Sequence, residues 1–209
     1  LLSAGLGEAG IRLTTAAGVN AVSISEFVIA RLLQIAKRLP DIDRAQGERR
    51  WSPTYGREIA GSTLGVVGLG AIGREVARRG RALGLRVVAA RQSWRPGMKD
   101  DDVDELYGPG DLAALLAASD MVVSAVPETS ATVDLFDAAA FEAMRPGAVF
   151  VNVGRGSAVV EGDHRTVLVR HREVDRDDVH PEALVLSLAG HDAVEERHVT
   201  DERRRPVLQ

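Results

Sequence analysis

The chain has 209 residues and a net charge of −4, and it is 45% hydrophobic and 27% charged, as is usual for a folded globular domain. This composition argues against disorder, and no apolar run is long enough to form a membrane-spanning helix. The negative charge gives no general attraction to nucleic acid, and the absence of cysteine excludes disulfides and cysteine-ligated zinc. We expect a cytoplasmic protein.

The first part of the chain predicts a short strand, a long helix and a polar connector. The run Ile11–Thr15 alternates apolar and polar residues, which predicts a strand. Ser23 and Glu26 have capping-box spacing, so a helix is expected to begin there and to end at Pro40. Its apolar surface is wider than one stripe. Two roles therefore stay open for this helix, packing in an internal core or forming a subunit interface.

From about residue 64, strands alternate with helices, a pattern typical of parallel strands joined by helical crossovers. The predicted strands are Leu64–Val67, Leu85–Ala90, Met121–Val126 and Ala148–Val153. The predicted helices are Ala71–Leu83, Asp111–Ala118 and Asp137–Met144. The strands are rich in valine, as expected when helices cover both faces of a sheet. The sequence thus predicts an α/β fold.

A glycine-rich motif follows the first of these strands and opens a helix. Gly68 allows a tight turn, Gly70 lets a diphosphate approach the backbone, and Gly73 lets the helix pack closely on the strand. The amides of Ala71 and Ile72 begin the helix, where backbone N–H groups and the helix dipole attract phosphate. A purely structural turn is the alternative. The motif in this context predicts a Rossmann doubly wound parallel sheet that binds a dinucleotide.

The end of the second strand indicates which dinucleotide is bound. An acidic residue at this position commonly binds the adenosine ribose hydroxyls, but here the position holds Arg91. Its cation suits a 2′-phosphate, and Gln92 and Ser93 add hydrogen-bond donors. We therefore expect NADP to be favoured over NAD. In the alternative interpretation, Arg91 lies along the adenine or faces solvent.

Six segments agree in order and spacing with one enzyme family. They are Thr15–Asn20, Gly56–Gly61, Gly68–Gly73, Val126–Thr129, Met144–Gly147 and Val151–Gly156. Together they resemble the D-isomer-specific 2-hydroxyacid dehydrogenases, and in character the glyoxylate and hydroxypyruvate reductases, from about Gly10 to Val160. The resemblance implies hydride transfer between a nicotinamide and a small 2-oxo or 2-hydroxy acid, such as glyoxylate or hydroxypyruvate.

The resemblance also implies roles for single residues. Arg155 matches the arginine that holds the substrate carboxylate and polarises its carbonyl, a task suited to a permanently charged planar fork of donors. A surface turn residue is the alternative for Arg155. Pro127 and Thr132 match positions around the cofactor. Val153 and Gly154 match positions beside the nicotinamide.

The sequence departs from the family where the general acid is expected. The family uses a histidine whose pKa is raised by a glutamate. The segment from Asp178 to Leu184 is faintly similar to the one that carries the glutamate, so Glu182 is the candidate, and Asp178 could hold the nicotinamide amide. His191 is the nearest histidine but lacks the usual flanking residues. The favoured alternative is that His191 is exposed to solvent and has no role as general acid.

We divide the chain into three regions. Residues 1–55 are interpreted as a remnant of a substrate domain with a linking or dimerisation helix, 56–160 as the NAD(P)-binding Rossmann domain, and 161–209 as a divergent tail that could be partly disordered. Because the chain starts with Leu and carries only the last strand and loop of the substrate half, we expect its natural front end to be missing.

The expected partners are a small 2-oxo acid and a second copy of the chain, without nucleic acid, membrane or metal. Two other interpretations remain open. One is a catalytically impaired, nucleotide-binding protein that dimerises, like the C-terminal-binding corepressors that share this fold. The other is an inert fragment. Turnover with a nicotinamide cofactor would distinguish an enzyme from both.

Overall fold

The structure is a computed structural model that describes residues 14–160, 167–168 and 184–187. Its strands are β1 Thr63–Val67, β2 Arg86–Ala90, β3 Glu105–Tyr107, β4 Met121–Ser124, β5 Val149–Asn152, β6 Val167–Leu168 and β7 Leu184–Ser187. They form one sheet in the order β3-β2-β1-β4-β5-β7-β6, with every neighbouring pair parallel. The first strand, β1, lies in the middle of the sheet. β2 and β3 follow on one side of β1, and β4 lies on its other side. The doubly wound α/β sheet predicted from the sequence is thus confirmed.

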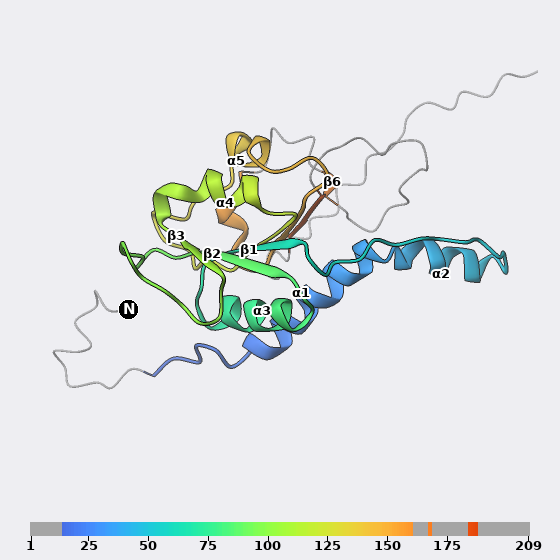
Figure 1. The fold of residues 1–209 in the computed structure, drawn as a ribbon, viewed down its shortest axis with the longest axis horizontal. Coiled ribbons are helices and arrows are strands. Elements are labelled where there is room, and N and C mark those ends of the chain that lie inside the picture. Colours follow the sequence, from blue (N-terminus) through green and yellow to red (C-terminus); the bar gives the residue numbers. More distant parts are fainter. Residues whose placement is uncertain (1–13, 161–166, 169–183, 188–209) are drawn as a thin grey trace, which may run out of the picture.

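Helices cover both faces of this sheet (Figure 1). The helices are α1 Ala21–Ala36, α2 Leu39–Gly47, α3 Ala71–Ala82, α4 Leu112–Ala118 and α5 Ala138–Glu142. α1 and α3 lie on one face, and α4 and α5 lie on the other. Because successive strand residues point to opposite faces, Val66 joins the core under α1 and α3 while Val67 joins the core under α4.

Helix α1 contributes to the internal core. Val28 and Leu32 are almost fully buried in the cluster that also contains Val76 of α3. The opposite side of α1 is more open, because Val22 is 50% exposed and Phe27 is 36% exposed. Of the two roles left open for this helix, core packing is therefore confirmed for its inner face.

The predicted boundaries of this helix were wrong. α1 begins at Ala21, before the expected capping box, and no side chain caps its N-terminus. It ends before Arg38, which adopts a left-handed backbone conformation (φ 54°) and starts a second helix, α2. Pro40 lies in the first turn of α2, where a residue without an N–H loses no hydrogen bond. Proline thus marks the start of a helix here.

Other departures lie at the ends and edges of elements. Thr14 and Thr15 are not in a strand, and the rest of the predicted strand Ile11–Thr15 lies outside the described residues. The edge strand β3 was not predicted, and neither were β6 and β7 in the tail. β4 ends at Ser124, two residues earlier than expected, because the chain turns away there to form the loop that begins with Ala125.

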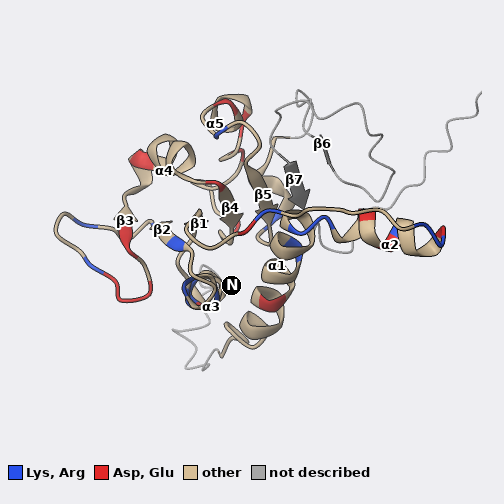
Figure 2. Cartoon of the chain, turned by 45° about the vertical axis from the view of Figure 1, so that its right-hand side comes forward, with Lys and Arg blue, Asp and Glu red and all other residues tan. Residues whose placement is uncertain are grey.

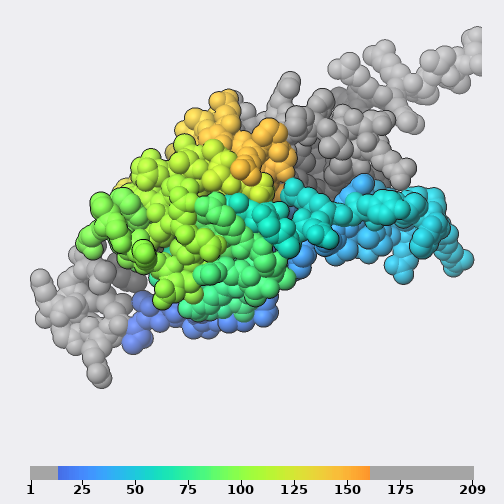
Figure 3. Space-filling view, viewed as in Figure 1, coloured from blue at the N-terminus to red at the C-terminus, as the bar shows by residue number. Residues whose placement is uncertain are grey.

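Residues 39–55 form an arm that projects from the sheet domain (Figures 1 and 3). The returning chain is fixed to the end of α1, where the Arg57 N–H donates to the Ala36 carbonyl at 2.8 Å. A side chain at Gly56 would come within 2.5 Å of the Lys37 Cα atom, so only glycine allows this close crossing. Among the described helices, none has the length and apolar character to cross a bilayer.

Candidate functional site

The glycine-rich turn joins β1 to α3 at the centre of the sheet. Gly68 has a φ of +99°, and a Cβ atom there would lie 2.8 Å from the Ala125 carbonyl oxygen. A Cβ atom at Gly73 would clash with the Gly68 carbonyl oxygen and press on Val66. Both positions therefore require glycine, as predicted: Gly68 for the turn and Gly73 for close packing of α3 on β1.

Gly70 differs from these two glycines because nothing lies near it. A Cβ atom at Gly70 would meet no other atom within 4 Å, and both Gly70 and Ala71 are exposed while Ile72 is half-buried. The turn therefore leaves open space beside the first amides of α3, a helix of 12 residues. Exposed N–H groups at a helix start attract an anion. These residues thus fit the diphosphate of a dinucleotide.

Two further loops meet this turn. Gly18, in the loop before α1, lies against Ala71, and a Cβ atom at Gly18 would be 3.4 Å from the Ala71 Cβ atom. The loop after β4 lies beside it, because β4 is the neighbour of β1 in the sheet and a Cβ atom at Gly68 would contact Ala125. In doubly wound sheets, ligands bind where the strand order reverses, outside the carboxyl ends of the strands. In this sheet that point lies between β1 and β4.

The loop after β4 is ordered by Thr132. Its Oγ1 atom donates to the Pro127 carbonyl at 2.5 Å and accepts from the Thr129 N–H at 2.8 Å. These bonds close residues 127–132 into a compact turn. Pro127 and Thr132, both expected near the cofactor, thus lie together in the loop that follows the Gly68 contact at Ala125.

The turn after β5 presents Arg155 to solvent. Asn152 is fully buried, and its side chain spans the turn: its Oδ1 atom accepts from the Gly154 N–H and its Nδ2 atom donates to the Arg155 carbonyl, both at 3.0 Å. A Cβ atom at Gly154 would lie 2.5 Å from the Val126 carbonyl oxygen. Gly154 therefore packs directly on the loop after β4, while Val153 is buried beneath it.

The Arg155 side chain itself is exposed. Within the described residues, its guanidinium forms no hydrogen bond or ion pair. An arginine that is permanently charged and free of intramolecular partners can bind a carboxylate. Asn152 is a residue that the sequence analysis did not single out, although its place inside the Val151–Gly156 motif was a signal for it.

Arg91 lies at the carboxyl end of β2, with Gln92 and Ser93 exposed beside it. The Arg91 Nε atom donates to the Ser93 Oγ atom at 2.9 Å, and its Nη1 atom lies 3.7 Å from the Asp100 Oδ2 atom. Arg91 is therefore held next to an acidic residue that the sequence analysis did not consider. Asp100 is nine positions from Arg91 in the chain, so only the fold of the loop between them shows that the two side chains lie close together.

Asp100 also binds Arg74 in the first turn of α3. Arg74 donates to both oxygens of Asp100, at 2.9 and 2.7 Å, and to Asp102 at 2.8 Å. The Arg74 guanidinium holds the pKa of the Asp100 carboxyl below its ordinary value of 3.8. Arg74 and Arg78 of α3 thus both bind the β2–β3 loop.

Three predicted site residues lie outside the described residues: Asp178, Glu182 and His191. The predicted general acid and its partner thus stay predictions. In the part of the chain that the structure describes, no group of three or more histidine, cysteine or acidic residues could hold a metal ion.

Known proteins resemble this chain in sequence. The family model described as "D-isomer specific 2-hydroxyacid dehydrogenase, NAD binding domain" matches residues 29–173. The D-3-phosphoglycerate dehydrogenase of Archaeoglobus fulgidus is 36% identical over 157 residues, 74% of this chain and 29% of that protein. The hydroxypyruvate reductase of Thermotoga maritima is 30% identical over 203 residues, 96% of this chain and 60% of that protein. The chain thus spans between about three tenths and three fifths of these relatives.

Solved structures resemble it in fold. A glycerate dehydrogenase related protein from Thermoplasma acidophilum superposes with a TM-score of 0.65 at 25% identity, covering 81% of this chain and 62% of that one. A D-isomer specific 2-hydroxyacid dehydrogenase family protein from Aeromonas salmonicida gives 0.64 at 30% identity, covering 83% and 59%. Together with the geometry of the glycine-rich turn, these matches show that the chain belongs to the D-isomer specific 2-hydroxyacid dehydrogenases and carries their NAD binding domain.

Proposed function

We propose that this chain is the cofactor-binding part of an NAD(P)-dependent oxidoreductase that acts on a small 2-oxo or 2-hydroxy acid of the glyoxylate or hydroxypyruvate kind. The observation that carries the proposal is the glycine-rich turn, with open space at Gly70 beside the start of α3, where Gly70 and Ala71 are exposed. The family names support the reaction class, and they include a hydroxypyruvate reductase and a glyoxylate reductase.

Each part of the site has a chemical task in this proposal. The amides at the start of α3 bind the diphosphate, and the loop residues Pro127 and Thr132 line the cofactor. The bound nicotinamide supplies or accepts the hydride. Arg155, which the buried Asn152 side chain supports through its carbonyl, binds the substrate carboxylate and polarises the carbonyl group.

We further propose a preference for NADP. Arg91 lies at the end of β2, where a 2′-phosphate on the adenosine ribose would lie, and exposed Gln92 and Ser93 flank it. A guanidinium binds phosphate oxygens with two parallel hydrogen bonds. One similar structure is named as an NADPH-dependent glyoxylate/hydroxypyruvate reductase, from Sinorhizobium meliloti, at 25% identity.

We propose that two copies of the chain associate through the arm. Trp51 is 93% exposed, Tyr55 is 85% exposed and Ile42 is 40% exposed, all between residues 39 and 55. Aromatic residues are enriched at protein interfaces, and clustered exposed apolar groups mark interaction surfaces. The same arm supports a second candidate function, a dimerising protein that senses the nucleotide without catalysis.

Substitution of Arg155 distinguishes these functions. The Arg155→Ala variant should lose at least about a hundredfold in kcat/KM for glyoxylate or hydroxypyruvate, because a preorganised charge on the reacting group is removed, while the Kd for NADPH stays unchanged. Arg155→Lys keeps the charge but not the planar fork, so it should recover only part of the rate. Absorbance loss of NADPH measures turnover, and calorimetry measures binding.

One outcome would contradict the role of Arg155, and another would contradict the enzyme proposal. Equal turnover in the Arg155→Ala variant would remove Arg155 from the reaction. Nucleotide-dependent association of the unaltered chain, with no turnover of any small 2-oxo acid, would favour the nucleotide-sensing function.

A further inference from the structure

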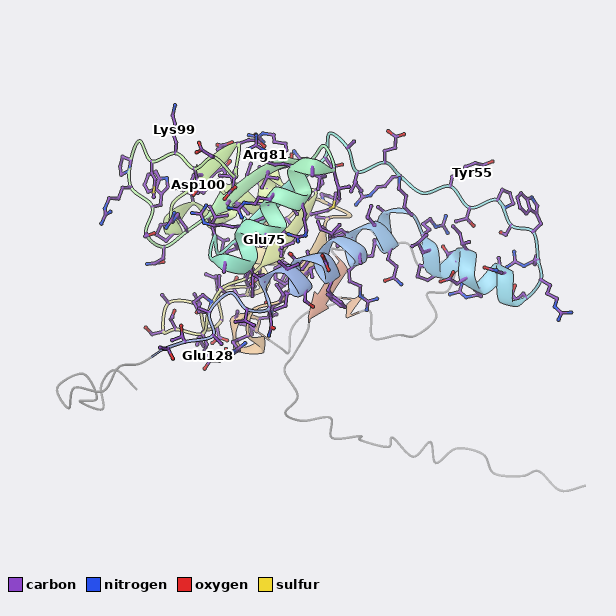
Figure 4. The ribbon with its side chains drawn as sticks, turned by 90° about the horizontal axis from the view of Figure 1, so that it is seen from below. Tyr55, Glu75, Arg81, Lys99, Asp100 and Glu128 are labelled. Carbon is purple, nitrogen blue, oxygen red and sulfur yellow. The ribbon has the colours of Figure 1, made fainter. Side chains whose placement is uncertain are left out.

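The loop between β2 and β3 is fixed to α3 by charged side chains. Arg74 binds Asp100 and Asp102, the Arg78 Nε atom donates to Asp102 at 2.9 Å, and Arg81 donates to the Asp101 carbonyl at 2.5 Å. Figure 2 shows the charges of both signs along this loop. In Figure 4, Asp100 lies next to α3 while Lys99 on the same loop points away from it. The side chains of Asp100 and Asp102 are therefore held against α3.

Asp100 lies between two guanidinium groups. Its Oδ2 atom is 2.7 Å from the Arg74 Nη2 atom and 3.7 Å from the Arg91 Nη1 atom, and its side chain is only 8% exposed. The first contact is part of a pair of hydrogen bonds, whereas the second is an ion pair beyond hydrogen-bond distance. Arg91 is thus the more weakly held of the two cations and can turn toward another anion.

Each cation of this network already has an acidic partner. Arg74 and Arg91 face Asp100, and Arg78 faces Asp102 and Glu75. A phosphate monoester carries about two negative charges near neutral pH. A 2′-phosphate bound to Arg91 would therefore lie close to the Asp100 carboxylate, and like charges that share a cation weaken each other's binding.

We propose that Asp100 determines cofactor specificity by competing with the 2′-phosphate of NADP for Arg91, and so limits the preference for NADP over NAD. This inference rests on the proposed binding of a nicotinamide nucleotide at the glycine-rich turn. The buried Asp100 carboxylate holds the Arg91 guanidinium toward the loop, and NADP binding must break this ion pair. NAD has no 2′-phosphate, so its binding leaves the ion pair intact.

The test compares the Kd values for NADPH and NADH in the full 209-residue chain. Asp100→Asn removes the charge and keeps the shape, so the ratio of the NADH Kd to the NADPH Kd should rise about three- to fivefold, the effect of one partly exposed ion pair. Asp102→Asn is the matched control, because the ion pairs of Asp102 within the described residues are with Arg74 and Arg78. The control should leave the ratio unchanged.

A double variant tests whether the effect acts through Arg91. In the Arg91→Ala background, Asp100→Asn should no longer change the ratio, because coupled residues are not additive in such a cycle. An unchanged ratio in Asp100→Asn, an equal change in Asp102→Asn, or a change that persists without Arg91 would each overturn the inference. If the unaltered chain bound neither nucleotide, the proposed function itself would fail, and the inference with it.

Discussion

Asn152 fixes the turn that carries Arg155 through two hydrogen bonds. Its buried side chain joins the Gly154 N–H to the Arg155 carbonyl, so the turn after β5 depends on one amide group. A buried N–H that loses its acceptor destabilises the fold by about 1–3 kcal/mol. Asn152 is therefore a positioning residue for Arg155.

Substitution of Asn152 tests whether its side chain stabilises the fold and positions Arg155. Asn152→Ala should lower the free energy of unfolding by about 1–3 kcal/mol and reduce kcat more than it changes the NADPH Kd. Asn152→Asp keeps an acceptor for the Gly154 N–H but buries a carboxylate against the Arg155 carbonyl oxygen, so it should destabilise the fold at least as much as Asn152→Ala. Chemical denaturation measures stability. Full stability of the Asn152→Ala variant would contradict this role.

The sequence predicted the glycines better than the contacts of charged residues. Gly68 and Gly73 were predicted because only glycine tolerates the turn and the close packing that the motif requires. The contact between Asp100 and Arg91 could not be predicted, because it depends on how the loop after β2 folds back. Local rules fix backbone conformation, whereas ion pairs across a loop need the tertiary structure.

Among the elements, the start of β4 is tied to its neighbours by Asp120. The Asp120 carboxylate accepts from the Thr63 N–H of β1 and from Arg145 of the turn before β5, each at 2.8 Å. Burial raises the pKa of this carboxyl, but these two hydrogen bonds outweigh burial, so the pKa lies below its ordinary value of 3.8. The charged form of Asp120 therefore stabilises the folded state.

This linkage predicts an acid dependence. A carboxyl whose pKa is lowered by folding stabilises the fold fully above its unfolded pKa, and it loses this effect as the pH falls through its folded pKa. Near neutral pH, Asp120→Asn should lower the free energy of unfolding by about 1–2 kcal/mol. Below pH 3.8 the difference from the unaltered chain should shrink. A difference that stays constant down to acid pH, measured by urea denaturation, would contradict the linkage.

The four buried central strands were predicted, whereas the edge strand β3 and the arm helix α2 were not. β1, β2, β4 and β5 are valine-rich and almost completely buried, so their composition alone marks them. β3 has three residues at the sheet edge, and each of them is exposed or half-buried. α2 lies in the arm and has one buried residue, Ala45. Because β3 and α2 bury so little, they leave little periodicity in the sequence.

Viewed as a whole, the molecule is a sheet domain with an arm that extends beyond it. Figure 4 shows Tyr55 far along this arm, away from α3. The exposed aromatic residues of the arm contact little of the described chain, and burying them against a second copy would remove apolar surface from water. The arm could not be predicted as a projection, because its path depends on the crossing of Gly56 over the end of α1.

Substitution in the arm tests the proposed association. Trp51→Ser should weaken self-association at least about tenfold, because buried tryptophans often dominate interface energies, while the melting temperature of the sheet domain stays the same. Trp51→Phe is the control and should keep most of the association. Sedimentation equilibrium measures the self-association of the three proteins, and thermal denaturation measures the melting temperature. A monomeric unaltered chain, or equal association of all three proteins, would contradict a dimer formed through the arm.

The most direct measurement is calorimetric titration of the unaltered chain and the Gly70→Ala variant with NADPH and NADH. The unaltered chain should bind at least one nucleotide. A methyl group at Gly70 meets no protein atom within 4 Å, so the variant should fold normally but bind at least about tenfold more weakly, because the diphosphate approaches the backbone there. Lack of affinity for both nucleotides, or equal affinity in the variant, would contradict a diphosphate site at this turn.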